Sequence, residues 1–214
     1  MIPLFHDFTD ERVLVFGGGP VGARKSRRFS TEATVVVVSP TFEADDYGDA
    51  ELLRAAPDPD AVSEWIDRID PALVVAATDV AAVNEAIAAA AADRGILLNR
   101  ADTSEVRDAK SVAVPATIDE GPVTVAVSSG ATSPAFAKEL RNQIEERVTG
   151  AGEAAVVVGE LRERLKAEAV EPEKRRAAIR AAVDAIDWKD LDTGSAKPRR
   201  SIETAVRDTL EEHE

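Results

Sequence analysis

Three glycines near the amino terminus carry the clearest chemical signal in this sequence. Gly17, Gly19 and Gly22 stand at G-x-G-x-x-G spacing. In a βαβ unit the first glycine allows a tight turn, the second lets the backbone approach a pyrophosphate, and the third lets a helix pack closely on a strand. The spacing therefore predicts a dinucleotide site at a helix N-terminus, where backbone N–H groups face the phosphates.

The residues on either side of the glycines support this prediction. Residues 12–16 form an apolar run typical of a buried parallel strand, residues 21–31 can form a helix, and residues 34–39 can form the next strand. A glycine cluster that only makes a tight turn is the alternative. We expect the cofactor to contact the glycine loop and the end of the second strand, namely Gly17, Gly19, Pro20, Val21, Gly22, Ser39, Pro40 and Thr41.

The residue that would recognise the ribose of the cofactor is not evident. Many dinucleotide-binding folds place an acidic residue at the end of the second strand, where it binds the ribose hydroxyls. This chain has Ser39, Pro40 and Thr41 there, and Glu43 is a candidate substitute. The sequence thus leaves the choice between NAD and NADP open.

Polar residues also follow two later apolar runs. Thr78 and Asp79 end the run 71–79, and Asn99 opens the polar segment 99–102 after the run 96–98. Ligands of doubly wound sheets lie beyond the carboxyl ends of the strands, so we expect Thr78 and Asp79 to face the cofactor. Asp79 could equally cap the helix expected over 80–94, with Gly95 as the C-terminal cap.

The pattern changes after residue 110. Residues 111–118 and 123–128 have the composition of antiparallel strands joined by a hairpin turn at 119–122. A polar loop, 128–134, follows, in which Ser133 is a suitable N-cap for a helix that begins at Pro134. That helix is expected to reach about Val148 and to carry an apolar stripe of Phe136, Leu140 and Ile144.

The remaining chain is expected to be helical, over 156–169, 172–186 and from 201 onward, with a linker at 193–198. We predict an α/β fold with three parts. They are a Rossmann-type parallel sheet over residues 1–110, a small antiparallel β dimerisation unit with its following helix over 111–150, and an α-helical domain over 151–214.

Composition limits the chemistry. The 214 residues carry a net charge of −14 and no cysteine. So acidic a chain is a poor partner for nucleic acid, and we interpret the charge as a hydrated, halophile-like surface. No group of potential ligands has metal-site spacing, so we predict no metal site. No apolar run reaches 18 residues, and no signal peptide is evident. We expect a cytoplasmic protein without membrane contact.

Four stretches of the chain resemble the precorrin-2 dehydrogenase/siroheme synthase family. They are residues 17–25, 77–79 with 83–84, 95–102, and 125–134. The resemblance implies NAD-dependent oxidation of precorrin-2 to sirohydrochlorin in siroheme (tetrapyrrole) biosynthesis and, in some members, ferrochelatase activity that inserts ferrous iron. It also implies a homodimer with the antiparallel strands at the contact.

The resemblance also implies site residues. It places the catalytic carboxylate at Asp102, the last residue of an Asn-x-x-Asp motif. Histidine is a poor candidate for acid-base chemistry because His6 and His213 lie near the two ends of the chain. Candidate substrate-binding residues are Asn99, Ser128, Ser129, Gly130, Thr132 and Ser133. Cations that could hold the carboxylates of a tetrapyrrole, or simply be solvated, are Arg24, Lys25, Arg100 and Lys138.

The sequence departs from the family pattern in three ways. Ala131 replaces the second glycine of the polar loop, Val112 stands where an aromatic residue is common, and the methyltransferase domain of some bacterial members is not found. Two other function classes remain open. One is an NAD-binding regulatory module, and the other is an unrelated small-molecule NAD(P) oxidoreductase. Asp102 and the polar loop favour an enzyme, because a sensor needs no second polar loop facing the nicotinamide.

Overall fold

The computed structural model describes residues 2–101, 111–130, 132–188 and 196–211. Packing divides the chain into two compact units, Met1–Val114 and Pro115–Glu214. The first unit ends close to the expected end of the Rossmann domain. The division of the remaining chain at residue 150 stays a prediction, because residues 115–214 form one unit here.

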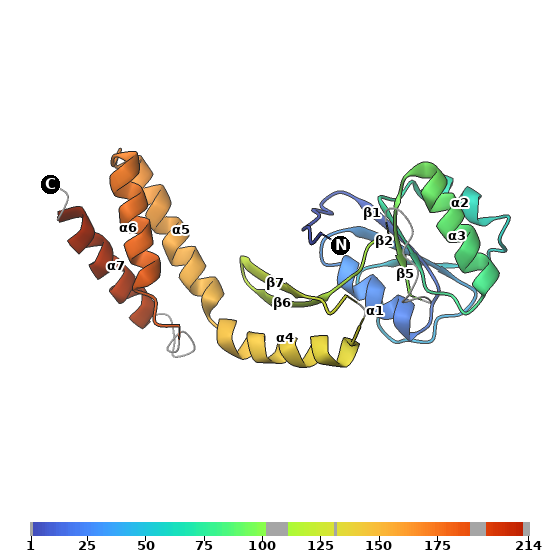
Figure 1. Ribbon diagram of the computed structural model, residues 1–214. Helices are drawn as coiled ribbons and strands as arrows, with labels where there is room; N and C mark the ends of the chain where they lie inside the picture. The colour runs from blue at the N-terminus through green and yellow to red at the C-terminus, as the bar shows by residue number, and fades with distance from the viewer. Residues whose placement is uncertain (1, 102–110, 131, 189–195, 212–214) are drawn as a thin grey trace. The chain divides into compact units, whose positions relative to one another are not determined.

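The first unit is built on a parallel five-stranded sheet with the strand order β3-β2-β1-β4-β5. This order matches the first five strands of the classic Rossmann order 3-2-1-4-5-6, so the predicted Rossmann-type sheet is confirmed. Figure 1 labels β1, β2 and β5 of this sheet beside α1, α2 and α3. The strands are β1 (Arg12–Phe16), β2 (Thr34–Ser39), β3 (Glu51–Arg54), β4 (Leu73–Ala76) and β5 (Leu97–Arg100). The helices are α1 (Pro20–Phe29), α2 (Val62–Ile69) and α3 (Ala81–Arg94).

The central strands are buried on both faces, which explains their uninterrupted apolar runs. Successive side chains of a strand point to opposite faces of the sheet. In β1, Val13 and Val15 pack with Phe29 of α1, whereas Leu14 and Phe16 pack on the side of α2 and α3. A strand covered by helices on both sides therefore needs apolar residues at every position.

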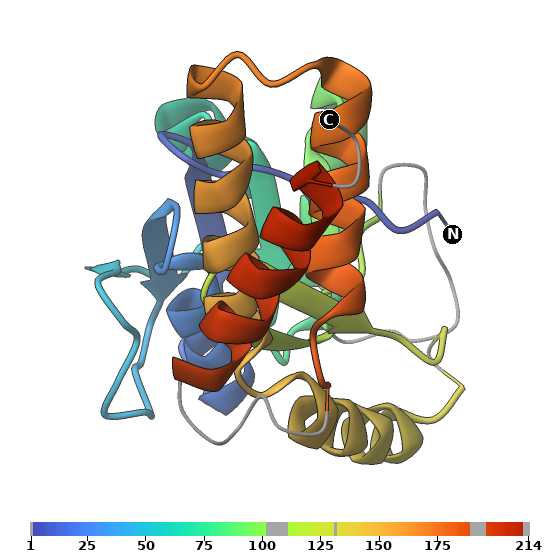
Figure 2. The same cartoon turned by 90° about the vertical axis from the view of Figure 1, so that its left-hand side faces the viewer.

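The second unit joins an antiparallel hairpin to four helices. The hairpin consists of β6 (Ala116–Glu120) and β7 (Val123–Val127), and Gly121, with φ of 61°, opens its turn. The helices are α4 (Pro134–Val148), α5 (Ala151–Ala167), α6 (Pro172–Asp184) and α7 (Ala196–Glu211). Figure 2 shows α5, α6 and α7 side by side, and buried Leu165, Ala178 and Ile202 lie in the core between them.

Two boundaries in the structure correct the sequence prediction. The first antiparallel strand begins at Ala116, not at residue 111, because Ser111 makes a parallel bridge with Leu98 and Val112 N–H donates to the Leu98 carbonyl at 2.8 Å. The expected linker at 193–198 overlaps α7, which begins at Ala196. Pro198 does not break that helix, because the first turn needs no intrahelical N–H donor. Within the described ranges, no helix is long and apolar enough to cross a bilayer.

Candidate functional site

The glycine loop lies at the carboxyl end of β1, and its three predicted glycines have different structural roles. A Cβ on Gly17 would lie 2.2 Å from the Ala77 carbonyl oxygen, and one on Gly22 would lie 1.9 Å from the Gly17 carbonyl oxygen. Both glycines are therefore required by packing. Beyond its chain neighbours, a Cβ on Gly19 would meet only the Glu43 carboxylate among the described residues, at 3.8 Å. The backbone at Gly19 is thus open to a ligand.

The helix that starts beside Gly19 has no side-chain cap at its amino end. Gly19 is the N-cap residue of α1 and makes no side-chain hydrogen bond to the first turn, and that turn has no acidic residue. Pro20 and Val21 are exposed. Backbone N–H groups at such an end, with the positive end of the helix dipole, favour an anion. The open Gly19 backbone and the helix end without a side-chain cap together fit the pyrophosphate of a dinucleotide.

The segment after β2 packs directly on the glycine loop. A Cβ on Gly18 would lie 2.2 Å from the Thr41 carbonyl oxygen and 2.8 Å from the Ser39 hydroxyl. Ser39 is buried, while Pro40 and Thr41 are exposed. The structure therefore brings the predicted Ser39–Thr41 segment and the glycine loop together. It also adds Gly18, which the motif spacing leaves unspecified, as a residue that must lack a side chain.

Tyr47 holds the segment after β2 against the glycine loop through hydrogen bonds, and the sequence analysis did not identify this residue. Its buried hydroxyl donates to the Gly18 carbonyl and accepts from the backbone N–H groups of Glu43 (3.1 Å) and Ala44 (3.3 Å). The Ser26 hydroxyl of α1 donates to the Tyr47 carbonyl at 2.6 Å. Tyr47 is the single tyrosine of the chain, which was the only signal available.

Thr78 and Asp79 follow the end of β4, and in the described part of the chain Thr78 has side-chain hydrogen bonds to its neighbours. The Thr78 hydroxyl donates to Asn84 Oδ1 at 2.7 Å, and Asn84 Nδ2 donates back to the Thr78 carbonyl at 2.9 Å. Asp79 does not cap α3, which corrects one reading of the sequence. The N-cap is Val80, whose N–H donates to the Thr78 hydroxyl at 3.2 Å. Asp79 is exposed, and its role toward the cofactor stays a prediction.

Asn99, near the end of β5, has a described hydrogen-bond partner for its side-chain nitrogen but none for its side-chain oxygen. Its Nδ2 donates to the Val112 carbonyl at 2.8 Å. This bond links β5 to a residue 13 positions later in the chain. Its Oδ1 is buried and accepts no hydrogen bond in the described part of the chain. An unpaired buried acceptor is costly unless a ligand supplies a donor. Asp102, the predicted catalytic residue, lies outside the described residues.

Most hydroxyl groups of the polar loop 128–134 form hydrogen bonds within the loop or to the first turn of α4. The Ser129 hydroxyl donates to the Ser133 carbonyl at 2.9 Å, and Ser133 Oγ accepts from Phe136 N–H at 3.2 Å, which confirms the predicted N-cap of α4. Ser128 Oγ accepts from Gly130 N–H at 3.2 Å. Thr132 is exposed. Contacts of this loop with a substrate stay a prediction.

The first unit matches a known family. The model of NAD_binding_7, a family of NAD(P)-binding domains, matches residues 4–116, just over half of the chain. The match includes the whole parallel sheet and the glycine loop. This chain belongs to the NAD_binding_7 family.

Relatives of this NAD_binding_7 protein include siroheme synthases, as the four sequence stretches indicated. The enzyme of Methylococcus capsulatus is 37% identical over 179 residues, 82% of this chain and 36% of the relative. That of Methylobacillus flagellatus is 33% identical over 198 residues, 90% of this chain and 39% of the relative. This chain thus spans well under half the length of these curated relatives. SirC, a precorrin-2 dehydrogenase, shares the fold, with a TM-score of 0.68 over 97% of this chain and 100% of SirC at 22% identity.

The four candidate cations of this NAD_binding_7 protein differ in environment. Arg24 and Lys138 are exposed. The Arg100 side chain, only 10% exposed, forms an ion pair with Glu85 at 2.8 Å. Burial, with a smaller contribution from the charge of Arg24, lowers the pKa of Lys25 from 10.5 to about 8. Arg24 and Lys138 are therefore the cations most accessible to a carboxylate in solution.

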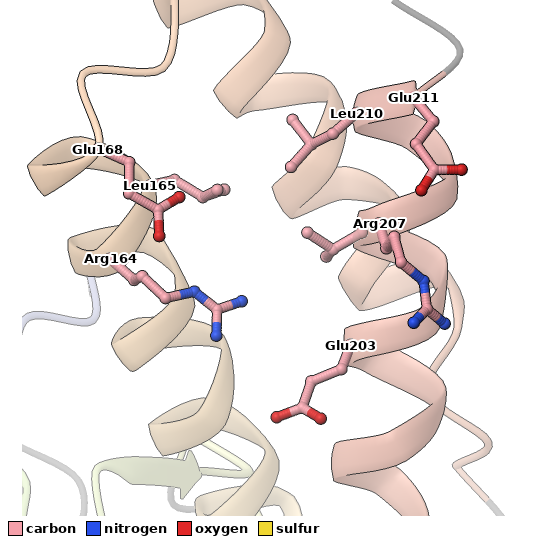
Figure 3. Close-up of a pocket in the computed structure, with 8 residues that line it drawn as sticks. Arg164, Leu165, Glu168, Glu203, Arg207, Leu210 and Glu211 are labelled. Carbon is pink, nitrogen blue, oxygen red and sulfur yellow. The ribbon is translucent and has the colours of Figure 1, made fainter.

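A cavity of about 290 Å³ lies in the helical part of the second unit, between α5 and α7 (Figure 3). Its apolar part comes from Leu165, Val206 and Leu210, and charged side chains such as Arg164 and Glu203 border it. None of the predicted site residues lines this cavity. The predicted cofactor-binding residues lie instead at the carboxyl ends of β1, β2 and β4.

Proposed function

We propose that this chain is an NAD-dependent precorrin-2 dehydrogenase, which oxidises precorrin-2 to sirohydrochlorin in siroheme biosynthesis. The observation that carries the proposal is the open backbone at Gly19 beside the end of α1 that lacks a side-chain cap. It occurs in a chain that aligns with siroheme synthases over most of its length. The fold of SirC supports the same conclusion.

Within this proposal the residues of the first unit bind and orient the cofactor. The glycine loop and the first turn of α1 would hold the pyrophosphate, and residues 39–41 would lie along the adenosine half. When bound, NAD supplies the site that accepts a hydride. Asn99 Oδ1 is suited to accept from an amide or pyrrole N–H, because it is buried and no described residue donates a hydrogen bond to it.

Asp102 is the proposed catalytic residue, on the strength of its motif. Loss of two hydrogens from precorrin-2 releases a hydride and a proton, and the proton needs a base. Ala101, the residue before Asp102, still bonds to the sheet, with its N–H donating to the Ala76 carbonyl at 2.9 Å. In the chain, Asp102 therefore follows directly on the carboxyl end of β5. A carboxylate there would take the proton.

Insertion of ferrous iron into sirohydrochlorin is a second reaction that the family resemblance implies. Iron would be a substrate in that reaction and not a resident cofactor. No group of three potential metal ligands occurs among the described residues. We propose that Asp102 would also accept the pyrrole protons if the chain carries out this step.

We also propose that the chain works as a homodimer. Its small sheet has two strands, β6 and β7, in the described residues, and a two-stranded sheet is marginal alone in water. Phe136 and Leu140 of α4 are 62% and 37% exposed. A second copy of this chain could cover both the strand edges and these apolar side chains.

The test is to mix the purified chain with precorrin-2 and NAD without oxygen and to record the spectra of sirohydrochlorin and NADH. Appearance of both products at equal rates is the expected result. A regulatory module would bind NAD without forming either product. An unrelated oxidoreductase would leave precorrin-2 unchanged while oxidising simple alcohols or reducing carbonyls. Either result would reject the proposed function.

The role of Asp102 is tested with Asp102→Ala and the isosteric Asp102→Asn. Both should bind NAD as wild type does, because the glycine loop is untouched. Both should oxidise precorrin-2 about 100-fold to 10,000-fold more slowly, the usual contribution of an acid-base group. Activity within a few-fold of wild type in Asp102→Asn would exclude a proton-transfer role. Iron insertion measured on the same variants would reveal whether one carboxylate serves both reactions.

A further inference from the structure

An acidic side chain lies beside the glycine loop, but it does not come from the end of β2, where many dinucleotide-binding folds place one. Ser39, at the end of β2, is buried and uncharged. Four residues later, Glu43 brings its Oε2 to within 3.8 Å of the position that a Cβ on Gly19 would occupy. Among the described residues, and leaving aside the chain neighbours of Gly19, no other heavy atom lies within 4 Å of that position. Glu43 therefore borders the space that the cofactor is expected to enter.

The backbone of Glu43 is fixed, although its side chain is exposed. Its N–H donates to the Gly18 carbonyl at 2.9 Å and also lies 3.1 Å from the Tyr47 hydroxyl. That hydroxyl in turn bonds to Gly18. The Glu43 backbone is thus held beside the glycine loop by hydrogen bonds, so the carboxylate can reach the space next to Gly19.

The chemistry of a carboxylate at this place distinguishes two dinucleotides. A carboxylate accepts hydrogen bonds from the vicinal hydroxyls of an unmodified ribose, and these charge-assisted bonds are strong. A phosphate on the 2′-hydroxyl removes a donor and brings negative charge near the carboxylate, which is repulsive. The same residue would therefore favour NAD and disfavour NADP.

Side chains of both charges surround Glu43. Asp45 lies two residues beyond Glu43 and is exposed, while Asp46 interacts with Arg27 at 3.7 Å. The nearby Arg54 donates to the Pro40 carbonyl at 3.0 Å and lies over the Phe42 ring, 5.6 Å from its centroid. Arg54 is the cation that could serve a 2′-phosphate, so its influence competes with that of Glu43.

We propose that Glu43 selects NAD over NADP by accepting hydrogen bonds from the adenosine ribose and by repelling a 2′-phosphate. The proposal rests on the proposed use of a nicotinamide dinucleotide. It adds a specificity residue that lies outside the glycine motif and outside the end of β2.

The test is calorimetric titration of wild type, Glu43→Gln and Asp45→Asn with NAD and with NADP, without substrate. Wild type should bind NAD more tightly. Glu43→Gln should weaken NAD binding about tenfold or more and reduce the NAD-to-NADP affinity ratio by at least that factor, since a charged hydrogen-bond acceptor is lost. Asp45→Asn removes the same charge two residues away and should leave the ratio unchanged.

Three results would overturn the proposal. They are an unchanged affinity ratio in Glu43→Gln, an equal change in Asp45→Asn, and tighter binding of NADP than NAD by wild type, which would point to Arg54. Wild type that binds neither dinucleotide would reject the proposed function as well. If wild type binds NAD and Glu43→Gln leaves the NAD-to-NADP affinity ratio unchanged, only the role of Glu43 is rejected. The proposed function is then unaffected.

Discussion

Gly19 and Gly22 belong to one motif but have different physical tasks. Gly19 has an ordinary extended backbone, with φ of −80° and ψ of −177°, and space for a side chain. The space around Gly22 is filled by the Gly17 carbonyl. A motif read from sequence treats both glycines alike, whereas the structure separates a ligand-facing glycine from a packing glycine.

We therefore expect Gly19→Val to lose dinucleotide binding without losing the fold. The valine would occupy the pyrophosphate position, so NAD affinity should fall about tenfold or more, while the melting temperature stays near that of wild type. Calorimetric titration and thermal unfolding measure the two effects.

The matched control for Gly19 is Gly22→Ala. Its Cβ would lie 1.9 Å from the Gly17 carbonyl oxygen, so this variant should melt at a clearly lower temperature. Equal NAD affinity in Gly19→Val and wild type would contradict the placement of the pyrophosphate.

Lys25 is the residue whose ionisation should affect stability. Burial lowers its folded pKa to about 8, below the unfolded value of 10.5. Between these values the unfolded chain binds more protons than the folded chain, so this residue makes stability rise with pH. Below about pH 8 the charged form is destabilising in the folded state by a constant amount.

Lys25→Met should remove that dependence. Near pH 7 the variant should be more stable than wild type, on the order of 1–3 kcal/mol, and the difference should disappear as the pH approaches 10.5. Urea unfolding at several pH values measures this, with Lys138→Met as the control for loss of an exposed lysine charge. Parallel stability curves for Lys25→Met and wild type would contradict the prediction.

At the scale of elements, the loop between β2 and β3 depends on one hydroxyl. Tyr47→Phe removes the group that bonds to Gly18, Glu43 and Ala44. We expect a loss of about 1–3 kcal/mol in the free energy of unfolding, because the three hydrogen bonds of a buried hydroxyl are lost together. NAD binding should also weaken, because the loop that carries Glu43 is released.

Ser26→Ala is the comparison for Tyr47→Phe. It removes a buried hydrogen bond to the Tyr47 carbonyl but leaves the Tyr47 hydroxyl and its three partners in place. Urea unfolding should find both variants destabilised, whereas titration with NAD should find only Tyr47→Phe impaired. Wild-type NAD affinity in Tyr47→Phe would show that the loop needs no fastening to bind the cofactor.

At the scale of the whole molecule, the exposed apolar side chains of α4 predict self-association. We expect wild type to be a dimer by light scattering at micromolar concentration. Phe136→Glu with Leu140→Glu should give a monomer, because two charges would be placed in the proposed contact. Val183→Glu, at a position 40% exposed on α6, is the control and should remain a dimer. A monomeric wild type would reject the proposed assembly.

The sequence by itself determined the elements whose signals are local. Uninterrupted apolar runs predicted β1 and β2, Gly95 ended α3 with φ of 70°, and Ser133 capped α4. These features depend on a few neighbouring residues, on strand burial from both faces, or on the special backbone of glycine. The same signals located the glycine loop and, with the family resemblance, the class of the fold.

Only the tertiary structure decided how residues far apart in the chain meet. Tyr47 bonds to Gly18 across 29 residues, and no periodicity records such a pairing. The stripe of Phe136 and Leu140 has helical spacing, yet that spacing could not reveal that both side chains stay exposed. Placement of Glu43 beside Gly19 likewise requires the β2–β3 loop to fold back on β1. Sequence patterns report which residues prefer burial, whereas strand order and loop closure decide which residues they meet.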